Sequence, residues 1–216
     1  MTRALVLFGS PGSGKGTQAK LLSACLKIPH ISTGDMLRER AHKGNSIGTA
    51  VVATMHTGAL VADEVVDRMV EERLAQPDCA QGFILDGHPR TRQQAEFLTR
   101  WLDQRQIREV VIHLVVDYNI IISRLTGRRQ CPRCGTLYNT ASNPPRVDNV
   151  CDLDGEPLGV RDDDREEVIR ERLETYEKQT QPLIEFFREN GRRLVEVNAG
   201  VDAPESVSQK ICKLIT

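Results

Sequence analysis

Several classes of protein are excluded by what the sequence lacks. Its 216 residues contain no apolar run approaching the roughly 20 residues that a membrane-spanning helix needs. Lys and Arg number 29 against 30 Asp and Glu, so the formal net charge is −1. There is therefore no overall basic field for nucleic acid or for an anionic membrane. We expect a globular chain that binds neither and is long enough for one sizeable core with an insert or two.

A secretory signal peptide and a guanine-reading motif are also lacking. Met1-Thr-Arg leads straight into an apolar run, which favours a cytoplasmic protein whose thiols stay reduced. The six Cys are then expected to be core residues or metal ligands rather than disulfides. No Asn-Lys-x-Asp motif occurs, and this argues against a GTPase-like switch.

The most informative stretch that is present lies near the start. Leu5–Phe8 is an apolar run closed by glycine, as in a buried strand. The segment Gly9–Lys15 then fits the G-x-x-x-x-G-K phosphate loop. Gly12 and Gly14 let backbone N–H groups turn inward around an anion, and Lys15 can reach the β- and γ-phosphates of a nucleotide. A glycine-rich turn that binds nothing is the alternative.

The residues after Lys15 depart from the general phosphate loop. Gly16 stands where a Ser or Thr usually ligates Mg²⁺, and the hydroxyl arrives one residue later at Thr17. We infer that Mg²⁺ takes its ligands mainly from phosphates and water, and that Thr17 bonds a phosphate. Helical spacing over residues 17–26 aims a helix dipole at the same anion. The variant GxPGxGKGT resembles the nucleoside monophosphate kinases, adenylate kinase above all, with ATP contacts implied at Gly12, Ser13, Gly14, Lys15, Gly16 and Thr17.

A helical insert is expected after the second strand, Ile28–Ile31. A helix follows over Met36–His42, a break at Lys43–Ser46, and a further helix over Ile47–His56. After a turn, Asp63 is expected to cap a helix that ends at Leu74. An ordinary crossover connection would also fit this pattern. However, STGDMLR resembles the monophosphate-binding flap of adenylate kinases, which implies AMP contacts at Thr33, Arg38, Ala59, Leu60 and Val61.

The third strand, Gly82–Asp86, is apolar until its last residue. Because ligands of open α/β sheets sit at the carboxyl ends of strands, Asp86 is placed to accept hydrogen bonds from Mg²⁺-bound water. An Asp that only caps the next turn is the alternative. The following residues resemble the DGFPRT motif of adenylate kinases, with His88 in place of the usual Phe. This resemblance implies AMP contacts at Gly87, His88, Pro89 and Arg90.

Two residue types are expected to recognise AMP. Arg90 can grip its phosphate in bidentate fashion. Gln94 can satisfy the donor and acceptor edge of adenine, and together with Thr33 it indicates AMP rather than UMP or CMP. The ring of His88 is expected to lie near bound AMP, as a shape substitute for Phe rather than as a pH sensor.

A central strand is expected over Glu109–Val116, with His113 as a satisfied strand histidine. Arg124 and Arg128 are four residues apart, which predicts one side of a helix end. They are either a solvated basic face or a pair that neutralises phosphate. The resemblance to adenylate kinases favours contact with ATP, and it extends the ATP site to Leu137, Tyr138, Gly200 and Val201, the last two in a loop after the strand Arg193–Val197.

A cysteine-containing insert follows. Cys131-x-x-Cys134 and Cys151-x-x-Asp154, with sixteen residues between Cys134 and Cys151, match a closed four-ligand zinc site, similar to the zinc-bearing lid of long-form adenylate kinases. Asp152 could substitute, although the paired spacing favours Asp154. Reduced core cysteines are one alternative. A nucleic-acid-binding zinc ribbon is another, disfavoured by the seven basic and seven acidic residues from position 124 to position 165.

The last part of the chain adds two arginines and the remaining elements. Arg161 and Arg172 match the lid-closing, phosphate-contacting arginines of the resembled family, which implies AMP contacts at both. Carboxylates at positions 162–164 suit the start of a long helix. Pro182 is expected to interrupt that helix. A final helix is expected over residues 205–214.

The sequence therefore predicts an α/β fold with a doubly wound, five-stranded parallel sheet. The expected parts are a core (1–31, 62–126 and 165–216), an AMP-binding flap (32–61) and a zinc-binding lid (127–164). The implied reaction is ATP + AMP = 2 ADP with Mg²⁺, run by a monomer, and the alternative is a UMP/CMP-type kinase. The residues expected to act in catalysis are Lys15, Asp86, Arg90, Arg128, Arg161 and Arg172.

Overall fold

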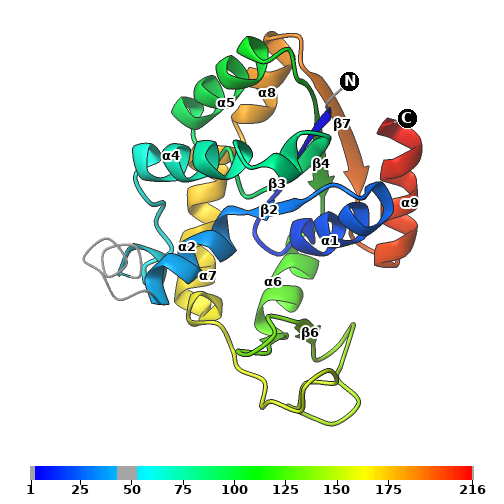
Figure 1. The fold of residues 1–216 in the computed structure, drawn as a ribbon. Coiled ribbons are helices and arrows are strands. Elements are labelled where there is room, and N and C mark those ends of the chain that lie inside the picture. Colours follow the sequence, from blue (N-terminus) through cyan, green and yellow to red (C-terminus); the bar gives the residue numbers. More distant parts are fainter. Residues whose placement is uncertain (1–2, 43–52, 216) are drawn as a thin grey trace.

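The computed structural model describes residues 3–42 and 53–215. Within these ranges, five parallel strands form the main sheet (Figure 1), in the order β2-β3-β1-β4-β7. Their bounds are Arg3–Phe8 for β1, His30–Ser32 for β2, Gly82–Asp86 for β3, Arg108–Val115 for β4 and Arg193–Asn198 for β7. The predicted doubly wound parallel sheet is confirmed, with strand ends shifted by one or two residues.

The register of the sheet brings predicted site residues to one edge. Asp86, the last residue of β3, lies opposite Leu7 of β1 and opposite Ser32 of β2. On the other side of β1, Phe8 lies opposite His113 of β4. Because β1 lies between β3 and β4, the loop that follows it starts where the strand order changes direction, which is where ligands of such sheets bind.

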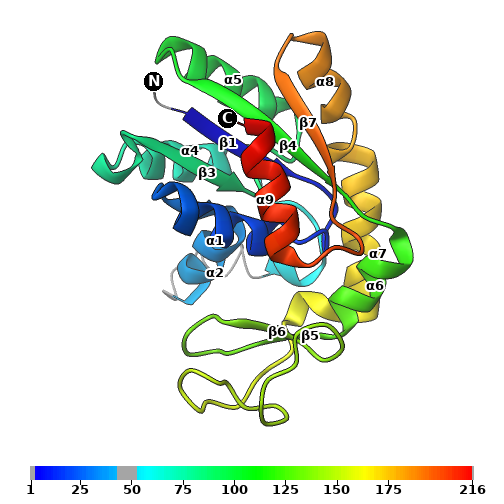
Figure 2. The same ribbon diagram turned by 90° about the vertical axis from the view of Figure 1, so that its right-hand side faces the viewer.

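Two apolar layers cover the two faces of the sheet (Figure 2). Alternate residues of each strand point to opposite faces, so that Leu5 and Leu7 join one layer while Val6 and Phe8 join the other. The first layer is covered by α1 (Lys15–Leu26) and α9 (Pro204–Ile215). The second is covered by α2 (Thr33–His42), α4 (Asp63–Leu74), α5 (Arg92–Gln104) and α8 (Leu183–Glu189).

A third, smaller cluster joins the core to the cysteine-containing insert. It is formed by buried side chains of α6 (Tyr118–Thr126) and α7 (Glu166–Thr175), which leave and re-enter the core on either side of that insert. Between them the chain forms a two-stranded antiparallel ribbon, β5 (Arg128–Gln130) with β6 (Leu137–Asn139). The ribbon lies beyond the end of α6, away from the main sheet (Figures 1 and 2).

The long helix is interrupted, as predicted from Pro182. After α7, the chain forms a π-helical turn, η3 (Tyr176–Thr180), and α8 begins directly after the proline. Proline lacks an N–H and its ring clashes with the preceding turn, which accounts for the break. The wider turn also re-aims the side chain of Thr180, whose hydroxyl donates to the Arg90 carbonyl oxygen at 2.8 Å.

The flap differs from the prediction in its details. The first helix, α2, begins at Thr33, three residues before the predicted start. The expected break at 43–46 and part of the expected second helix lie outside the described residues, and residues 53–56 are helical. Asp63 is the first residue of α4 rather than its cap: its carboxylate accepts hydrogen bonds from Thr91 and Gln94 instead.

Two short 3₁₀ turns complete the described secondary structure, η1 (Pro77–Cys79) and η2 (Asp162–Asp164). None of the described helices combines the length and the apolar composition that crossing a membrane requires.

Candidate active site

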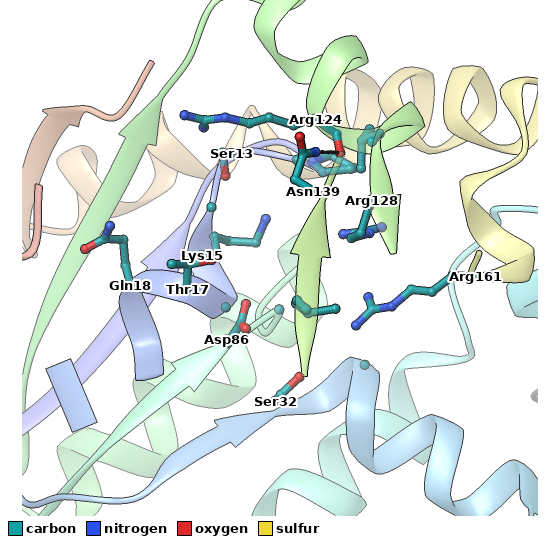
Figure 3. A pocket seen from close by; sticks show the side chains of 18 of the residues that line it. Ser13, Lys15, Thr17, Gln18, Ser32, Asp86, Arg124, Arg128, Asn139 and Arg161 are labelled. Carbon is teal, nitrogen blue, oxygen red and sulfur yellow. Dashed lines mark hydrogen bonds between the residues drawn. The ribbon is translucent and has the colours of Figure 1, made fainter. Parts of the chain in front are cut away.

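A cavity of about 1290 Å³ lies at the carboxyl edge of the main sheet. Its walls come from the loop after β1, the flap, the ribbon and the start of α9 (Figure 3). All the nucleotide-site residues predicted from the sequence line it, except His88 and Pro89. The structure therefore brings together side chains from positions 12 to 201 around one space.

The phosphate loop is held in shape by its own backbone and by α6. The Ser13 amide donates to the Ser10 carbonyl oxygen at 3.1 Å. Gly12 has φ +81°, and a Cβ there would lie 2.9 Å from Cγ of Leu125. A side chain at this position would thus clash with α6 as well as strain the backbone. The loop ends at Gly14, directly before the first turn of α1, whose dipole favours an anion.

Lys15 is turned back onto the loop. Its Nζ donates to the carbonyl oxygens of Gly9 at 2.8 Å and of Ser10 at 2.9 Å. Burial lowers the pKa of Lys15 to about 8, and the nearby arginines lower it further while Asp86 opposes the shift. These two carbonyl oxygens therefore accept the hydrogen bonds that phosphate oxygens would accept from the same ammonium group.

Asp86 reaches the same space from β3. Its Oδ2 lies 3.2 Å from Nε2 of His30, and a Cβ at Gly16 would come within 3.3 Å of the same oxygen. The carboxylate therefore lies against the first turn of α1, below Lys15 and Thr17 in Figure 3. An oxygen donor at this place suits a hydrated Mg²⁺, which keeps most of its waters.

Five arginines, called here the arginine cluster, line the cavity: Arg38, Arg90, Arg128, Arg161 and Arg172. Each is held by an acceptor of the protein. Arg90 donates from Nε to the Gly87 carbonyl oxygen at 2.9 Å, and Arg38 donates to Asp35 at 2.6 Å. Arg161 donates from Nε to the Gln130 side chain at 2.6 Å and extends into the cavity in Figure 3.

Two carboxylates from η2 hold the other arginines of the cluster. Arg128 forms a two-point ion pair with Asp164, whose side chain is fully buried. Arg172 contacts both Asp163, at 3.0 Å, and Asp164, at 3.2 Å. The three consecutive Asp were predicted only to favour a helix N-terminus. Their ion-pairing role was missed because it depends on residues that the lid and α7 bring close.

The electrostatics of the cluster are unfavourable without a ligand. Burial lowers the pKa of Arg161 to about 10, and repulsion from Arg128 and Arg38 adds to the shift. Burial likewise lowers the pKa of Arg90 and of Arg172, with repulsion from neighbouring arginines contributing to both shifts. A polyanion in the cavity would relieve this repulsion, so the cluster is suited to bind phosphate groups.

The predicted helix pairing of Arg124 and Arg128 is wrong. The helix α6 ends at Thr126, so that Arg124 lies in its last turn while Arg128 begins strand β5. Arg124 donates to the carbonyl oxygens of Ala199 and Gly200, both at 2.9 Å. It therefore fixes the loop before α9, which places Gly200 and the exposed Val201 at the cavity wall.

The residues predicted to recognise adenine are already hydrogen-bonded within the protein. Thr33 donates to the Gly87 carbonyl oxygen at 2.9 Å. Gln94 donates from Nε2 to Asp63 and accepts from the Arg90 amide, both at 2.7 Å. Each end of the Gln94 amide keeps one further hydrogen-bonding position, since an amide offers two donors and two lone pairs.

His88 and Pro89 do not line the main cavity. The His88 side chain is fully buried and its Nε2 lies 2.9 Å from Oδ1 of Asp67 on α4. The structure therefore turns the ring toward α4, whereas the sequence predicts a ring beside AMP. Pro89 faces an adjoining pocket of about 70 Å³ that Tyr176 and Thr180 also line.

The four predicted metal ligands converge in the ribbon insert. Ligand atoms of Cys131, Cys134, Cys151 and Asp154, called here the cysteine knuckle, all lie within 4.8 Å of one another. Sγ of Cys134 and Sγ of Cys151 are 3.6 Å apart. Tetrahedral zinc with Zn–S bonds of about 2.3 Å needs ligand separations of roughly 3.7 Å, so the donor set fits zinc.

Neighbours of the knuckle resolve one alternative. Asp152 is turned away, because its Oδ1 accepts from the Arg146 amide at 2.9 Å. Tyr138 is buried, and its hydroxyl lies 3.5 Å from Sγ of Cys151. Tyr138 also lines the large cavity, so that this residue lies between the cavity and the knuckle.

His113 is the satisfied strand histidine that the sequence predicts. Its ring nitrogens lie 3.1 Å from Glu196 and 3.4 Å from the Tyr176 hydroxyl, and its ring packs edge-on against Phe8.

Comparison with known proteins decides the family. A family model described as "Adenylate kinase" matches residues 7–192. This range contains the phosphate loop, the arginine cluster and the cysteine knuckle.

The chain belongs to the adenylate kinase family.

Three curated relatives, each named "Adenylate kinase", match nearly the whole chain. One from Anaeromyxobacter dehalogenans strain 2CP-1 is 47% identical over 205 residues, covering 94% of both chains. One from Clostridium perfringens strain SM101 is 44% identical over 212 residues, covering 98% of this chain and 97% of the relative. One from Pseudothermotoga lettingae is 46% identical over 217 residues, covering 98% and 99%. The alignments with the Clostridium and Pseudothermotoga relatives extend over almost all of both chains, whereas the family model ends at residue 192.

Proposed function

We propose that this protein transfers the γ-phosphoryl group of ATP to AMP and so catalyses ATP + AMP = 2 ADP. The observation that supports this most is the single cavity in which Lys15, Asp86 and the arginine cluster meet between a phosphate loop and a helical flap. Membership of the adenylate kinase family supports the same reaction. A UMP/CMP-type kinase is not favoured.

The proposed mechanism needs no nucleophile from the protein. An oxygen of the AMP phosphate attacks the γ-phosphorus in line, and the bond to the β-phosphate bridging oxygen breaks. Lys15 and the loop amides hold the β- and γ-phosphates. Arg38 and Arg90 hold the AMP phosphate, while Arg128, Arg161 and Arg172 face the transferring group. These positive charges stabilise the charge that develops on the phosphoryl oxygens.

When a nucleotide binds, some side chains of the site must exchange a hydrogen-bond partner in the protein for a phosphate oxygen. Lys15 leaves the carbonyls of Gly9 and Ser10 for phosphate oxygens. The ion pairs of Arg128 and Arg172 with Asp163 and Asp164 keep these guanidinium groups oriented, and their remaining N–H groups bind the nucleotide. Preorientation of this kind lowers the cost of ordering side chains when substrate arrives.

Mg²⁺ is the proposed cofactor, with Asp86 as the carboxylate that orients its water ligands. A Mg²⁺ ion held there would supply positive charge that neutralises part of the charge on the phosphate oxygens. The placement of the Asp86 carboxylate against Gly16 supports this role. Absence of a side chain at Gly16 leaves room for a hydrated ion at that position.

We propose that Gln94 and Thr33, with the backbone at Ala59–Val61, select adenine at the monophosphate site. The free donor and acceptor positions of the Gln94 amide match the edge of adenine. The bonds from Gln94 to Asp63 and to the Arg90 amide fix the amide orientation that this reading requires.

We further propose that the chain works as three parts, a core (1–31, 62–126 and 165–216), a flap (32–61) and a lid (127–164) stiffened by structural Zn²⁺ at the cysteine knuckle. Closure of flap and lid over both nucleotides would exclude water, which competes with AMP as the phosphoryl acceptor. The ligands ATP, AMP and ADP are the only partners proposed, for a cytoplasmic monomer. The near-zero net charge supports the absence of a nucleic-acid partner.

A coupled assay with ATP and each of AMP, CMP, UMP and GMP tests this proposal. The expected result is a kcat/KM for AMP at least about 100-fold above the others, because the adenine-reading groups would be left unpaired by the wrong base. The matched variant Gln94→Leu should narrow that ratio while Arg100→Ala, an exposed position, leaves it unchanged. Comparable rates with CMP or UMP would contradict the proposal.

A further inference from the structure

Two cysteines outside the knuckle lie side by side on different helices. Cys25 lies near the end of α1 and Cys212 near the end of α9, 187 positions apart in the sequence. Their sulfur atoms are 3.9 Å apart, at van der Waals contact. Cys25 is exposed and Cys212 is half-buried.

The helices that carry them are held together along their length. Leu22 of α1 and Ile211 of α9 are both buried in the same apolar layer. At the other end of the pair, Nε2 of Gln18 donates to the Pro204 carbonyl oxygen at 3.0 Å. Figures 1 and 2 both draw α1 and α9 next to each other. The contact between the thiols is therefore part of a packed helix pair.

The other four cysteines have different surroundings. Cys79 is buried, and its sulfur lies near the side chains of Arg73 and Asp78. The remaining three belong to the cysteine knuckle. Neither the proposed phosphoryl transfer nor the proposed metal site uses Cys25 or Cys212.

We propose that Cys25 and Cys212 form a reversible disulfide when the protein meets a small-molecule disulfide. In the first step, the Cys25 thiolate attacks one sulfur of the small disulfide, forming a mixed disulfide and releasing one thiol. In the second step, the Cys212 thiolate attacks the Cys25 sulfur and displaces the second small thiol. The protein loses two electrons and two protons, and the small disulfide becomes two thiols.

The surroundings set this order of attack. Only Cys25 is exposed enough for an external reagent to approach in line. Burial raises the pKa of the Cys212 thiol, with the nearby Cys25 adding to the shift, so that fewer Cys212 thiolates are available to react first. Once Cys25 is in a mixed disulfide, Cys212 is already beside it and the second step is intramolecular.

Formation of the bond needs only a short approach. A disulfide has an S–S length of about 2.05 Å, so the two sulfurs must close by roughly 2 Å from their separation in the reduced form. The bond would fasten α9 to α1 and close a very long loop in the unfolded chain, which is the condition for the largest stabilisation by a disulfide.

The test uses the full-length protein loaded with zinc, incubated in mixtures of oxidised and reduced glutathione of stepped ratio. Intact mass, peptide mapping and the thermal midpoint are measured for wild type, Cys25→Ser and Cys212→Ser. Wild type is expected to lose the mass of two hydrogen atoms, to yield one cross-linked pair of peptides from α1 and α9, and to gain about 5 °C in its thermal midpoint. Excess reduced glutathione should reverse all three changes.

The two variants separate the steps. Cys212→Ser should accumulate one glutathione adduct at Cys25, because the second thiol is missing. Cys25→Ser should stay unmodified at position 212 over the same time. The proposal is overturned if wild type stops at the glutathione adduct, if neither thiol reacts, or if the cross-linked form has a lower thermal midpoint than the reduced form. Phosphotransfer activity is not a readout, so the outcome is independent of the proposed function.

Discussion

The large cavity gathers cationic side chains and the cysteine knuckle gathers possible metal ligands, and the two clusters are arranged in different ways. In the cavity, Lys15 and every arginine of the cluster donate to carbonyl or carboxylate oxygens of the chain itself. In the knuckle, the three sulfurs and one carboxylate lie within 4.8 Å of one another, and the side chains of Thr136 and Tyr138 and the Glu156 amide add further contacts.

This difference indicates two modes of ligand binding. Cations that already have acceptors can release a ligand without leaving buried charges unpaired, as a site that turns over requires. Four ligand atoms that already converge on one point are arranged to hold an ion that stays bound, as a structural metal site requires. Five experiments test this contrast.

The largest effect is expected from removing a cavity cation. Lys15→Ala and Arg90→Ala should each lower kcat by at least about 100-fold, because each removes a positive charge aimed at the phosphates. The thermal midpoints should change little, because both side chains line the cavity rather than fill the apolar core. Arg100→Ala, on the exposed side of α5, is the control and should keep the wild-type rate. Near-normal turnover of either cavity variant would contradict the site.

Removing a knuckle ligand should act on metal content and stability rather than on chemistry. Wild type should contain about one zinc per chain, and Cys131→Ser should lose it and lower the thermal midpoint by several degrees. Asp154→Cys should keep the metal. Asp152→Ala is the matched control, because that carboxylate faces the Arg146 amide. Metal analysis is decisive: less than about a tenth of an equivalent in zinc-supplied wild type would refute the site.

The lowered pKa of Lys15, about 8 against the usual 10.5, predicts a pH dependence of ATP affinity. Phosphate needs the ammonium form, which is the major form below about pH 8 and declines above it. The dissociation constant for ATP should therefore rise about fivefold from pH 8 to pH 9. The same shift disfavours protonation in the folded state, so this residue's contribution to folding stability rises with pH between about 8 and 10.5. Calorimetric titration would show the effect on affinity, and a flat profile up to pH 9.5 would contradict it.

A smaller effect is expected from Thr180, whose hydroxyl supports the Arg90 backbone from the π-helical turn. Thr180→Val keeps the shape but leaves the Arg90 carbonyl without this donor. A loss of about 1 kcal/mol corresponds to roughly a fivefold lower kcat/KM for AMP. Thr180→Ser should restore most of it. If Val and Ser variants behave alike, the hydrogen bond has no role in positioning Arg90.

The smallest effect on activity is expected at His88. His88→Phe should leave the pH profile of the KM for AMP between about pH 6 and 8 parallel to that of wild type, because the ring lies against Asp67 rather than in the cavity. It should nevertheless lower the free energy of unfolding by about 1–3 kcal/mol, since Asp67 loses a buried partner. Urea unfolding of His88→Phe with Asp67→Leu should recover part of this loss. A wild-type pH dependence that vanishes in the Phe variant would reverse the assignment.

The sequence predicted local features better than long-range ones. The phosphate loop, Asp86 and the knuckle were found because their residue types and spacings are fixed by the chemistry of one short segment. The pairing of Arg128 was predicted wrongly, since a helix period was continued past Gly127. At that glycine the chain turns into the ribbon, and a Cβ would meet Nδ2 of Asn139 at 2.9 Å.

Other misses share the same physical cause. The roles of Asp63 and His88 were assigned from neighbours in the sequence, whereas their partners come from α5 and α4 respectively. Likewise, nothing in the local pattern reveals that Asp164 meets Arg128, 36 positions away. Rules for helix caps and sequence motifs use only residues that are close in the sequence, so they do not predict contacts between residues that only folding brings together.

The parallel order of the main sheet has a consequence for synthesis on the ribosome. Strand β1 is made first, yet its neighbours β3 and β4 begin only at Gly82 and Arg108. The sheet face that carries Leu5 and Leu7 is covered later still during synthesis, because part of its cover is α9, which begins only at Pro204. A nascent chain therefore exposes apolar strand surface until translation is nearly complete, and non-local pairing of this kind folds slowly. Ribosomes that stall before residue 204 should accordingly hold chains that depend on holdase chaperones.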